Sequence, residues 1–433
     1  MPLPPQGRLW RRMWAHPRLM HFHRLMALVV LGNVALVIAL GHLPWTGAPR
    51  AAIATLTSLV VGNLGLAIIV RQQYVINLLF WLATRAPTSW PLWIRATLAK
   101  VYHFGGLHVG GAIAATAWYA ALVYVVLAHG GASTAATTIA IVQLVLLVAI
   151  ATISMPQFRA RHHDTFEIVK RFGGWASLIL FWAHAVVFAR DELAPGASLA
   201  YALVTSWQTW VLAAATLSVA LPWMRLRKVP VELVVPSKHV ALARFDYGVT
   251  PFAGSSTAIS RSPLREWHSF ANVPWPDRPG YRLTISRAGD WTGALIDDKP
   301  SHVWVKGIPT AGVANIEVLF KRVVYVATGS GIGPCLPHLL AQKVPASLVW
   351  ATRDPRATYG DELVDEILAV QPDAQIIDTH KQGKPDLVAL AYQAAVATGA
   401  EAVICISNKK LTWEVVYGLE SRGIPAYGAI WDS

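Results

Sequence analysis

Residues Val323-Val-Tyr-Val-Ala-Thr-Gly-Ser-Gly-Ile-Gly-Pro334 join an apolar run to three closely spaced glycines and a proline. Glycines at 329, 331 and 333 let backbone N–H groups approach a pyrophosphate, and the N-terminus of a following helix attracts its negative charge. Proline is tolerated at the first helical position, where its missing N–H is not needed. The segment therefore predicts a strand, a phosphate-binding turn at Gly329, Gly331 and Gly333, and a helix that begins at Pro334. Because the spacing differs from G-x-G-x-x-G, a tight turn that holds no ligand stays an alternative.

The pattern around this segment predicts a parallel α/β domain over residues 319–433, because short apolar runs alternate with amphipathic stretches. The expected strands are Val323–Ala327, Ser347–Ala351, Gln375–Asp378 and Ala402–Ile406. The expected helices begin at Pro334 and span Gly360–Val370, Asp386–Thr398 and Thr412–Arg422.

The preceding residues, 229–318, contain shorter alternating runs broken by Pro, Gly and Ser. They predict a small antiparallel β-barrel. Its expected strands are Val231–Val235, His239–Arg244, Trp267–Ala271, Tyr281–Arg287 and His302–Lys306.

Residues 1–228 are far more apolar, and they raise the hydrophobic content of the whole chain to 54% while only 14% of its residues are charged. A helix of about 18 or more apolar residues can cross a hydrocarbon core of roughly 30 Å. Six stretches meet this condition: Leu25–Leu43, Ala51–Val70, Phe104–Ala128, Thr134–Met155, Gly174–Ala189 and Leu199–Trp223. The segment Tyr74–Trp93, interrupted by prolines, instead predicts an interfacial helix.

The basic residues are concentrated in alternate loops, before the first stretch and after the second, fourth and sixth. The positive-inside rule then predicts a multi-pass protein of the cell membrane with both termini in the cytosol. The net charge of +13 is spread over these loops and not gathered on one face, so we expect no nucleic-acid partner.

Four motifs in the C-terminal half resemble, in order, those of the ferredoxin–NADP reductase superfamily, especially its NADPH oxidase and ferric reductase branch. They are Glu266-Trp-His268-Ser269-Phe270, Gly289-Asp-Trp291-Thr292, Thr328–Pro334 and Trp350-Ala-Thr-Arg353-Asp354. The resemblance implies that FAD binds along the first two motifs and NAD(P)H along the last two. It assigns flavin positioning to His268 and Ser269, and a contact with the adenosine phosphate to Arg353, which could otherwise be a solvated surface charge.

Two residues nearer the C-terminus are candidates for the catalytic site. Cys405 is what remains of the family's Cys-Gly-Pro, which is Cys405-Ile-Ser407 in this chain, and it could equally be a small buried apolar residue. Trp431 lies two residues from the chain end, where reductases of this superfamily often stack an aromatic ring on the flavin. The alternative is that its indole packs on the outer edge of the sheet.

The histidines do not support the paired haem ligands of the ferric reductase branch, which lie thirteen or fourteen residues apart on one helix. His108 and His184, which lie within the third and fifth expected spans, are also expected at different depths. We therefore expect no haem and no metal site. His184, deep in a span, either has a function or makes a hydrogen bond to a neighbouring helix.

The sequence as a whole predicts a multi-span α-helical membrane domain followed by a β-barrel FAD domain and an α/β NAD(P) domain, and it resembles TmpA-like membrane flavoproteins. The expected activity is electron transfer from NAD(P)H through FAD to a quinone or an apolar substrate in the lipid bilayer. Two alternatives remain: a haem-containing ferric or oxygen reductase, and a non-catalytic nucleotide-binding sensor or scaffold.

Overall fold

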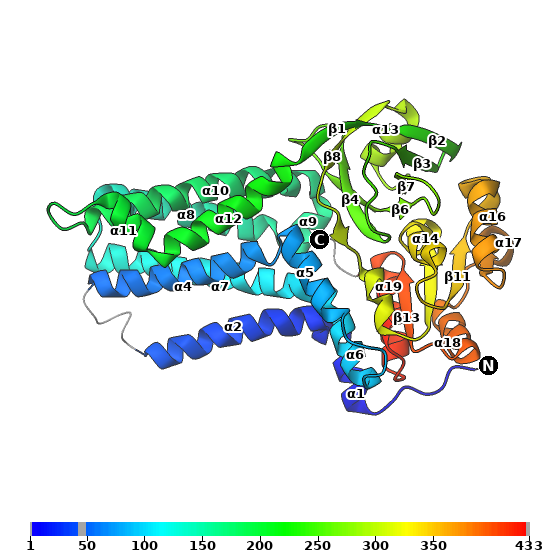
Figure 1. The fold of residues 1–433 in the computed structure, drawn as a ribbon. Coiled ribbons are helices and arrows are strands. Elements are labelled where there is room, and N and C mark those ends of the chain that lie inside the picture. Colours follow the sequence, from blue (N-terminus) through cyan, green and yellow to red (C-terminus); the bar gives the residue numbers. More distant parts are fainter. Residues whose placement is uncertain (1, 42–48, 430–433) are drawn as a thin grey trace.

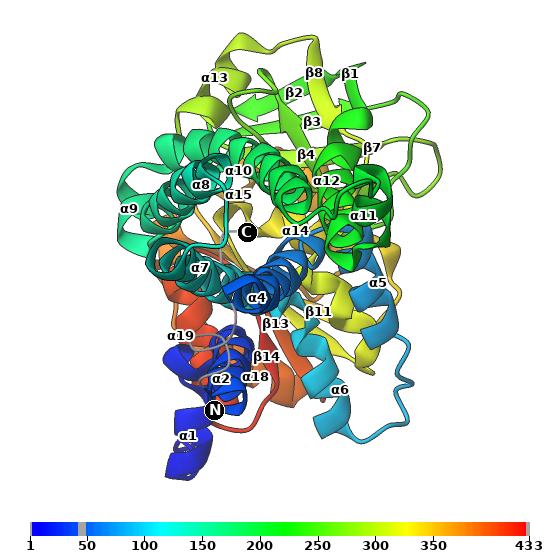
Figure 2. The same cartoon turned by 90° about the vertical axis from the view of Figure 1, so that its left-hand side faces the viewer.

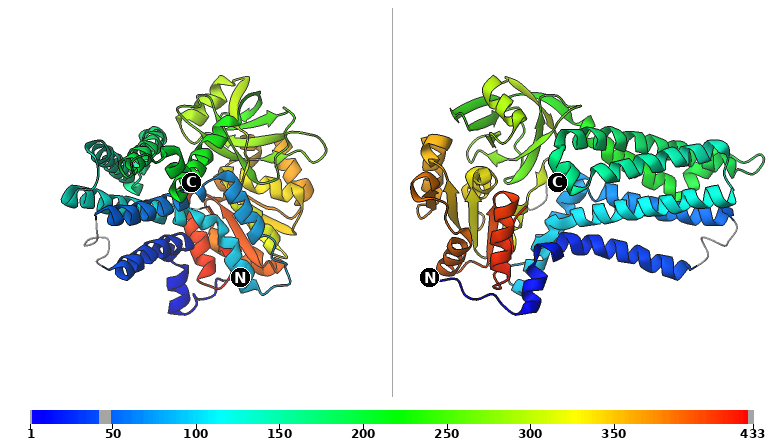
Figure 3. Two further views of the ribbon diagram at one scale, coloured as in Figure 1. Left: turned by 60° about the vertical axis from the view of Figure 1, so that its left-hand side comes forward. Right: turned by 180° about the vertical axis from the view of Figure 1, so that it is seen from behind.

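The computed structural model describes residues 2–41 and 49–429. A long helical bundle occupies one end of the molecule, and two smaller domains rich in strands lie together at the other end (Figures 1 and 3). The helices of the N-terminal region are α1 Leu9–Ala15, α2 His21–Leu40, α4 Pro49–Ile69, α5 Gln73–Ala83, α6 Leu92–Leu98, α7 Gly105–His129, α8 Thr134–Ile153, α9 Pro156–Arg161, α10 His163–Asp191, α11 Leu199–Thr205 and α12 Trp207–Met224. Two 3₁₀ turns, η1 Pro17–Leu19 and η2 Ala99–Phe104, connect them.

Five helices among the described residues are long and apolar enough to cross a membrane, and α11 with α12 would form a sixth span bent by 76°. They coincide with the six expected stretches, although the crossing itself stays a prediction. The largest difference concerns the fifth stretch, expected to be the shortest. Its helix, α10, runs for 29 residues because Gly173 and Gly174 do not interrupt it and a polar turn extends it.

Close packing of the bundle depends on glycines of α7. A Cβ atom on Gly106 would lie 2.2 Å from the carbonyl oxygen of Phe22 in α2, and one on Gly110 would lie 2.9 Å from Val29 Cβ. Figure 2, which looks along the bundle, shows α2 beside α7 and α4. Gly106 and Gly110 thus form a G-x-x-x-G contact, in which small residues let two helix backbones approach.

His184 of α10 makes a hydrogen bond to a neighbouring helix. Its Nδ1 lies 2.9 Å from the hydroxyl of Tyr119 in α7, and both side chains are buried. The hydrogen-bond interpretation of this histidine is therefore confirmed. Within the described residues, no group of His, Cys, Asp or Glu side chains is arranged to hold a metal ion.

The segment from α5 to η2 connects the bundle to both C-terminal domains. Arg95 of α6 makes a bidentate ion pair with Glu401, with Nη1–Oε2 and Nη2–Oε1 distances of 2.7 and 3.0 Å. Asn77 of α5 donates to the carbonyl of Pro309 at 2.9 Å and accepts from the backbone N–H of Ala311 at 2.9 Å. These contacts fix the orientation of the two domains on the bundle.

The first C-terminal domain contains two antiparallel sheets. One has the order β1-β8-β4-β5 with β9 paired to β4, and the other has the order β2-β3-β7-β6. The strands are β1 Leu226–Pro230, β2 Glu232–Ser237, β3 Val240–Phe245, β4 Ser255–Ser260, β5 His268–Ala271, β6 Val273–Pro274, β7 Tyr281–Ser286, β8 His302–Lys306 and β9 Thr310–Ala311. Helix α13, Asp290–Asp298, follows β7.

The expectation of a closed barrel is wrong for the described residues, because these sheets do not join into one. Both edge strands of the second sheet carry a proline, Pro236 in β2 and Pro274 in β6. A proline has no N–H to donate to a further strand, so pairing stops there. The sequence also missed β1, whose basic residues resemble the end of a membrane span.

The second domain has a parallel sheet with the order β12-β11-β10-β13-β14. Its strands are β10 Val323–Thr328, β11 Ala346–Thr352, β12 Gln375–Asp378, β13 Ala402–Ile406 and β14 Ala426–Tyr427. Its helices are α14 Ile332–Ala341, α15 Pro355–Tyr359, α16 Asp361–Val370, α17 Thr379–Gln382, α18 Leu387–Thr398 and α19 Lys409–Glu420, with 3₁₀ turns η3 Val313–Leu319 and η4 Gly329–Gly331.

Two apolar clusters cover opposite faces of this sheet, with α14 and α16 on one face and α18 and α19 on the other. The chain leaves β10 toward β11 and β12, then returns to the other side of β10 with β13. Beside β10 the order of strands therefore reverses. In open α/β sheets, ligands bind in the crevice at the carboxyl ends of the strands at such a point.

Candidate nucleotide-binding site

The glycine turn lies at the carboxyl end of β10, beside this switch point. Gly329 has a φ of +48°, which favours glycine, and the nearest atom to a Cβ on it would be the Tyr359 hydroxyl at 3.8 Å. Ser330 is exposed. Gly329 and Ser330 thus present their backbone to solvent, where a ligand could approach.

Gly331 and Gly333 serve a different purpose from the one expected, because protein atoms fill the space beside them. A Cβ on Gly331 would lie 2.0 Å from the carbonyl oxygen of Ile406, and one on Gly333 would lie 3.2 Å from Thr284 Cβ. These glycines let the turn pack against β13 and β7. Helix α14 begins at Ile332, so Pro334 is its third residue and not its first.

The hydroxyls of Thr328 and Ser407 connect the two strands that flank the crevice. Thr328 Oγ1 and Ser407 Oγ lie 2.5 Å apart. Lys409 and Lys410 follow at the start of α19, and both are exposed. Two hydroxyls therefore meet at the carboxyl end of β10 and β13, and two lysines follow in the chain, a composition suited to phosphate oxygens.

A buried tryptophan makes a hydrogen bond to the backbone of the glycine turn. The indole N–H of Trp350 in β11 donates to the carbonyl oxygen of Gly329 at 3.0 Å, and Tyr359 packs edge-on against that indole with ring centroids 5.0 Å apart. Burial raises the pKa of the Tyr359 hydroxyl, which keeps it neutral. The shape of the turn is thus fixed before any ligand binds.

Arg353 lies at the carboxyl end of the next strand, β11, and its side chain is 75% exposed. The next residue, Asp354, has a φ of +41°, so the chain turns away from the direction of β11 at this position. Its carboxylate is 3.0 Å from His380 Nδ1, and its N–H donates to Asp378 Oδ1 at 3.0 Å. Burial of Asp378 opposes ionisation, but N–H donors from Asp354 and His380 outweigh it and lower the pKa of the carboxyl.

These residues fit a nicotinamide dinucleotide. The carboxyl ends of the strands carry the half-buried backbone of Gly329 and the hydroxyls of Thr328 and Ser407. One strand away lies the exposed guanidinium of Arg353, whose Nε is 3.5 Å from Asp354 Oδ2. In addition, the buried hydroxyl of Thr284, beside Gly333, has no hydrogen-bond partner among the described residues. A polar ligand that reaches the start of α14 would give that hydroxyl a partner.

The residues expected to bind FAD fit that cofactor less well than the residues at the carboxyl ends of the strands fit a nicotinamide dinucleotide. The ring of Trp291 stacks on His268, with centroids 4.0 Å apart and planes at 25°, and extends over Phe270 at 6.4 Å. Thr292 Oγ1 accepts from the N–H groups of Ala288 and Gly289 and donates to the Gly289 carbonyl. The indole therefore already occupies one ring face of His268, and the Thr292 hydroxyl is engaged within its own helix cap. Ser269 is exposed.

Of the two expected catalytic residues, the structure describes only Cys405, and that residue is not at the surface. Cys405 lies in β13 and is fully buried, and burial raises the pKa of its thiol to about 12. Trp431 lies outside the described residues, so its role stays a prediction.

Sequence reasoning assigned no role in the site to Ser407 or Tyr359, and it named Trp350 only as part of the motif that contains Arg353. Ser407 was regarded only as a departure from Cys-Gly-Pro, although it follows a strand as Thr328 does. Residues that follow neighbouring parallel strands meet at one edge of the sheet, and this signal could have identified the pair.

A family model described as "Adenylate-forming reductase 03009, C-terminal domain" matches residues 313–433. Two curated relatives from Coprinopsis cinerea, Adenylate-forming reductase 03009 and Adenylate-forming reductase 06235, are 43% and 42% identical to this chain over 437 residues. Both matches cover 100% of this chain but only 42% of the relative. The chain thus spans less than half the length of these relatives.

Solved structures of the ferredoxin reductase type are more distant. A ferredoxin reductase in carbazole 1,9a-dioxygenase has 14% identity, covers 48% of this chain and 70% of its own, and has a TM-score of 0.36. A ferredoxin NADP+ reductase from Neisseria gonorrhoeae with bound FAD and NADP has 12% identity, covers 47% and 98%, and has the same TM-score. Scores at this level do not by themselves establish a relationship.

The expectation of a membrane flavoprotein that passes electrons through FAD to a quinone is wrong, because the relatives that match the whole chain are adenylate-forming reductases. The similarities described above do not show membership of the NADPH oxidase branch or of the TmpA-like proteins. Both relatives are named reductases, which agrees with the oxidoreductase class expected from the sequence. Over its full length, this chain is similar to adenylate-forming reductases.

Proposed function

We propose that this chain is the reductase part of an adenylate-forming reductase and that its α/β domain binds NAD(P)H in the crevice between β10 and β13. The observation that carries the proposal is the turn of Gly329 and the exposed Ser330 at the switch point of the sheet, beside the bonded hydroxyls of Thr328 and Ser407. When bound, the nicotinamide supplies a hydride.

The proposed acceptor is the activated acyl group that an adenylate-forming enzyme makes from a carboxylic acid. Hydride adds to the acyl carbon and forms a C–H bond, the carbon–oxygen bond to AMP breaks, and AMP leaves with the electron pair. The products are an aldehyde, AMP and the oxidised nicotinamide. This reaction balances without a flavin, and no step is assigned to FAD.

The helical bundle would hold this reductase at a membrane. Five or six helices of sufficient length and the contacts of α5 and α6 support this part of the proposal. An apolar acid or its aldehyde product would then partition into the bilayer next to the enzyme.

The experiment uses the full chain in a neutral detergent. NADPH binding is measured by calorimetry for wild type and for two variants of the exposed Ser330, Ser330→Asp and Ser330→Asn. A carboxylate at this position should repel the pyrophosphate and weaken binding roughly tenfold, while the uncharged amide of the same size should change it little. If wild type does not bind NADPH, or if both variants bind like wild type, the crevice is not the site.

The second arm adds hexanoyl or phenylacetyl adenylate with NADPH and measures NADPH loss and trapped aldehyde together. We expect aldehyde and oxidised nicotinamide in equal amounts, and a slower reaction in Ser330→Asp. If NADPH binds but neither adenylate gives an aldehyde, the proposed acceptor is wrong, while the proposed nucleotide site is not contradicted.

A further inference from the structure

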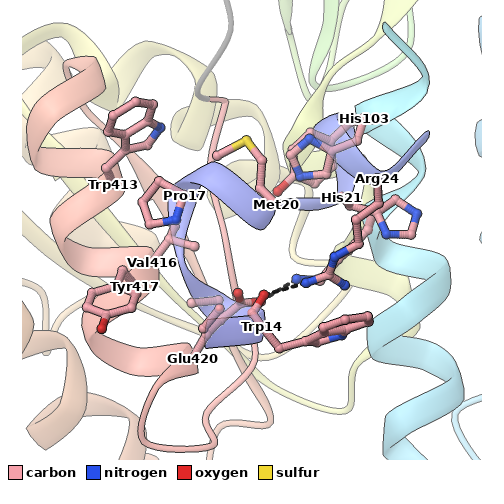
Figure 4. Close-up of a pocket in the computed structure, with 14 residues that line it drawn as sticks. Trp14, Pro17, Met20, His21, Arg24, His103, Trp413, Val416, Tyr417 and Glu420 are labelled. Atoms are coloured by element: carbon pink, nitrogen blue, oxygen red, sulfur yellow. Dashed lines mark hydrogen bonds and ion pairs between the residues drawn. The ribbon is translucent and has the colours of Figure 1, made fainter. Parts of the chain in front are cut away.

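A small cavity lies where the N-terminal segment, η2 and α19 meet (Figure 4). Its volume is about 20 Å³. Its lining includes Trp14, His21, Arg24, Lys100, His103 and Glu420. It thus combines side chains from the start of the first candidate span with others from the α/β domain.

The positive charge of this cavity is only partly neutralised. Lys100 Nζ lies 2.5 Å from Glu420 Oε1, so these two charges form a pair. The guanidinium of Arg24 lies 3.7 Å from the centroid of the Trp14 ring and donates to the Trp14 carbonyl oxygen. The described residues place no carboxylate in an ion pair with Arg24, so the lining keeps an excess positive charge.

A buried imidazole completes the lining. His103 is only 5% exposed, and its Nδ1 has no hydrogen-bond partner among the described residues. Its ring lies beside that of His21, with centroids 6.1 Å apart. A buried ring nitrogen without a partner costs free energy unless a ligand or water meets it.

The surroundings of the cavity indicate where the ligand comes from. Helix α1 exposes the apolar side chains Leu9, Trp10, Met13 and Trp14, at 53 to 68% of their surface, and it also carries Arg11 and Arg12. Tryptophans and arginines together are typical of the membrane interface, where rings enter the headgroup region and cations meet phosphates. Arg24 follows at the start of α2, the first candidate span.

We propose that this cavity binds the phosphate of an anionic phospholipid, with Arg24 as the charged contact and His103 as a hydrogen-bond partner. Basic pockets beside transmembrane helices at the cytosolic face hold such headgroups. The inference rests on the membrane placement proposed above, but not on the nucleotide site or on the reaction. Because α19 lines the cavity, the lipid would connect the α/β domain to the bilayer surface.

The test measures binding of dioctanoyl phosphatidic acid to the full chain in neutral detergent by thermophoresis, where no membrane surface potential contributes. We expect saturable binding, at least tenfold weaker binding of dioctanoyl phosphatidylcholine, and roughly a tenfold loss in Arg24→Gln. The matched control is Arg12→Gln, which removes the same charge from an exposed position outside the cavity and should leave binding unchanged.

A second variant, Ala15→Leu, fills the cavity without changing a charge and covers the case in which Arg24→Gln fails to fold. NADPH binding by each variant reports whether the α/β domain is intact. Equal binding in all variants would overturn the proposal. Inorganic phosphate that binds as tightly as the lipid would overturn the lipid assignment, since the acyl chains would then contribute nothing.

Discussion

The hydroxyl groups of Thr328 and Ser407 form a hydrogen bond of 2.5 Å that joins the carboxyl ends of β10 and β13. These strands lie side by side in the sheet but are 79 residues apart in the chain. The bond closes the base of the crevice in which we place the pyrophosphate. Both hydroxyls can also accept a ligand contact, because each oxygen has more than one lone pair.

Gly331→Ala tests whether the turn must pack this closely on β13. The new Cβ would lie 2.0 Å from the Ile406 carbonyl oxygen, so the turn must move. We expect a loss of about 1–3 kcal/mol in unfolding free energy, as for other overpacked sites. NADPH binding should weaken as well.

Gly289→Ala is the control for this variant, because a Cβ at that position meets no atom within 4 Å. Its stability, measured by chemical denaturation, should stay within about 0.5 kcal/mol of wild type. If Gly331→Ala is as stable as this control and binds NADPH normally, the close approach has no functional importance.

Arg353→Ala tests recognition of the cofactor's phosphate. The exposed guanidinium would pair with a 2′-phosphate, an interaction of about 1.5–3 kcal/mol, so NADPH affinity should fall roughly tenfold or more. NADH affinity should change little. Arg356→Ala is the matched control, since that arginine is already paired with Asp361 and Asp365. Equal losses for both cofactors, measured by calorimetry, would remove the basis for an NADPH preference.

The cysteines should be unreactive in the folded protein. Burial raises the pKa of the Cys405 thiol to about 12, and it raises the pKa of Cys335 as well. Only a minute fraction is thiolate at pH 8, and neither sulfur is exposed. A maleimide, followed by mass spectrometry, should label both only after denaturation. Rapid labelling of native Cys405 would restore it as a candidate for contact with the nicotinamide.

The sequence predicted the α/β domain almost element by element, because apolar runs such as Val323–Thr328 are buried on both faces and helices such as Leu387–Thr398 have clear caps. In the β domain all five expected strands are present, as β2, β3, β5, β7 and β8. The sequence missed the serine-rich strand β4 and the open sheet edges, which depend on the positions of two prolines. FAD binding by the expected motif stays a prediction. No local pattern shows that the Trp291 ring would stack on His268, since that contact joins a strand to a helix.

The ion pair between Arg95 and Glu401 should make stability depend on pH. The hydrogen bonds from Arg95 lower the pKa of Glu401 in the folded protein. A carboxyl with a depressed pKa contributes stability above its unfolded value of about 4.3, and the contribution is lost as the pH falls through the folded pKa. Because the Arg95 side chain is only 4% exposed, Glu401→Gln should cost about 3 kcal/mol at pH 7.

Melting curves at pH 7 and below pH 4 would show this dependence. The difference between wild type and Glu401→Gln should be large at pH 7 and should shrink in acid. Glu414→Gln, at an exposed position of α19, should match wild type at both pH values. A difference that does not change with pH would mean that the charge of Glu401 is not what connects α6 to the α/β domain.

The last prediction concerns the contact between α2 and α7. In Gly110→Leu, the new Cβ atom would lie 2.9 Å from Val29 Cβ and 3.0 Å from the Met26 carbonyl oxygen, so the two helices must separate. Helices in a bilayer gain no hydrophobic free energy from association, and their close packing supplies most of the attraction. We therefore expect Gly110→Leu to lower the melting temperature in detergent. Gly32→Leu places the same side chain on α2 where nothing lies within 4 Å, and it should not lower that temperature. Equal melting temperatures would show that the glycines of α7 are not needed for this contact.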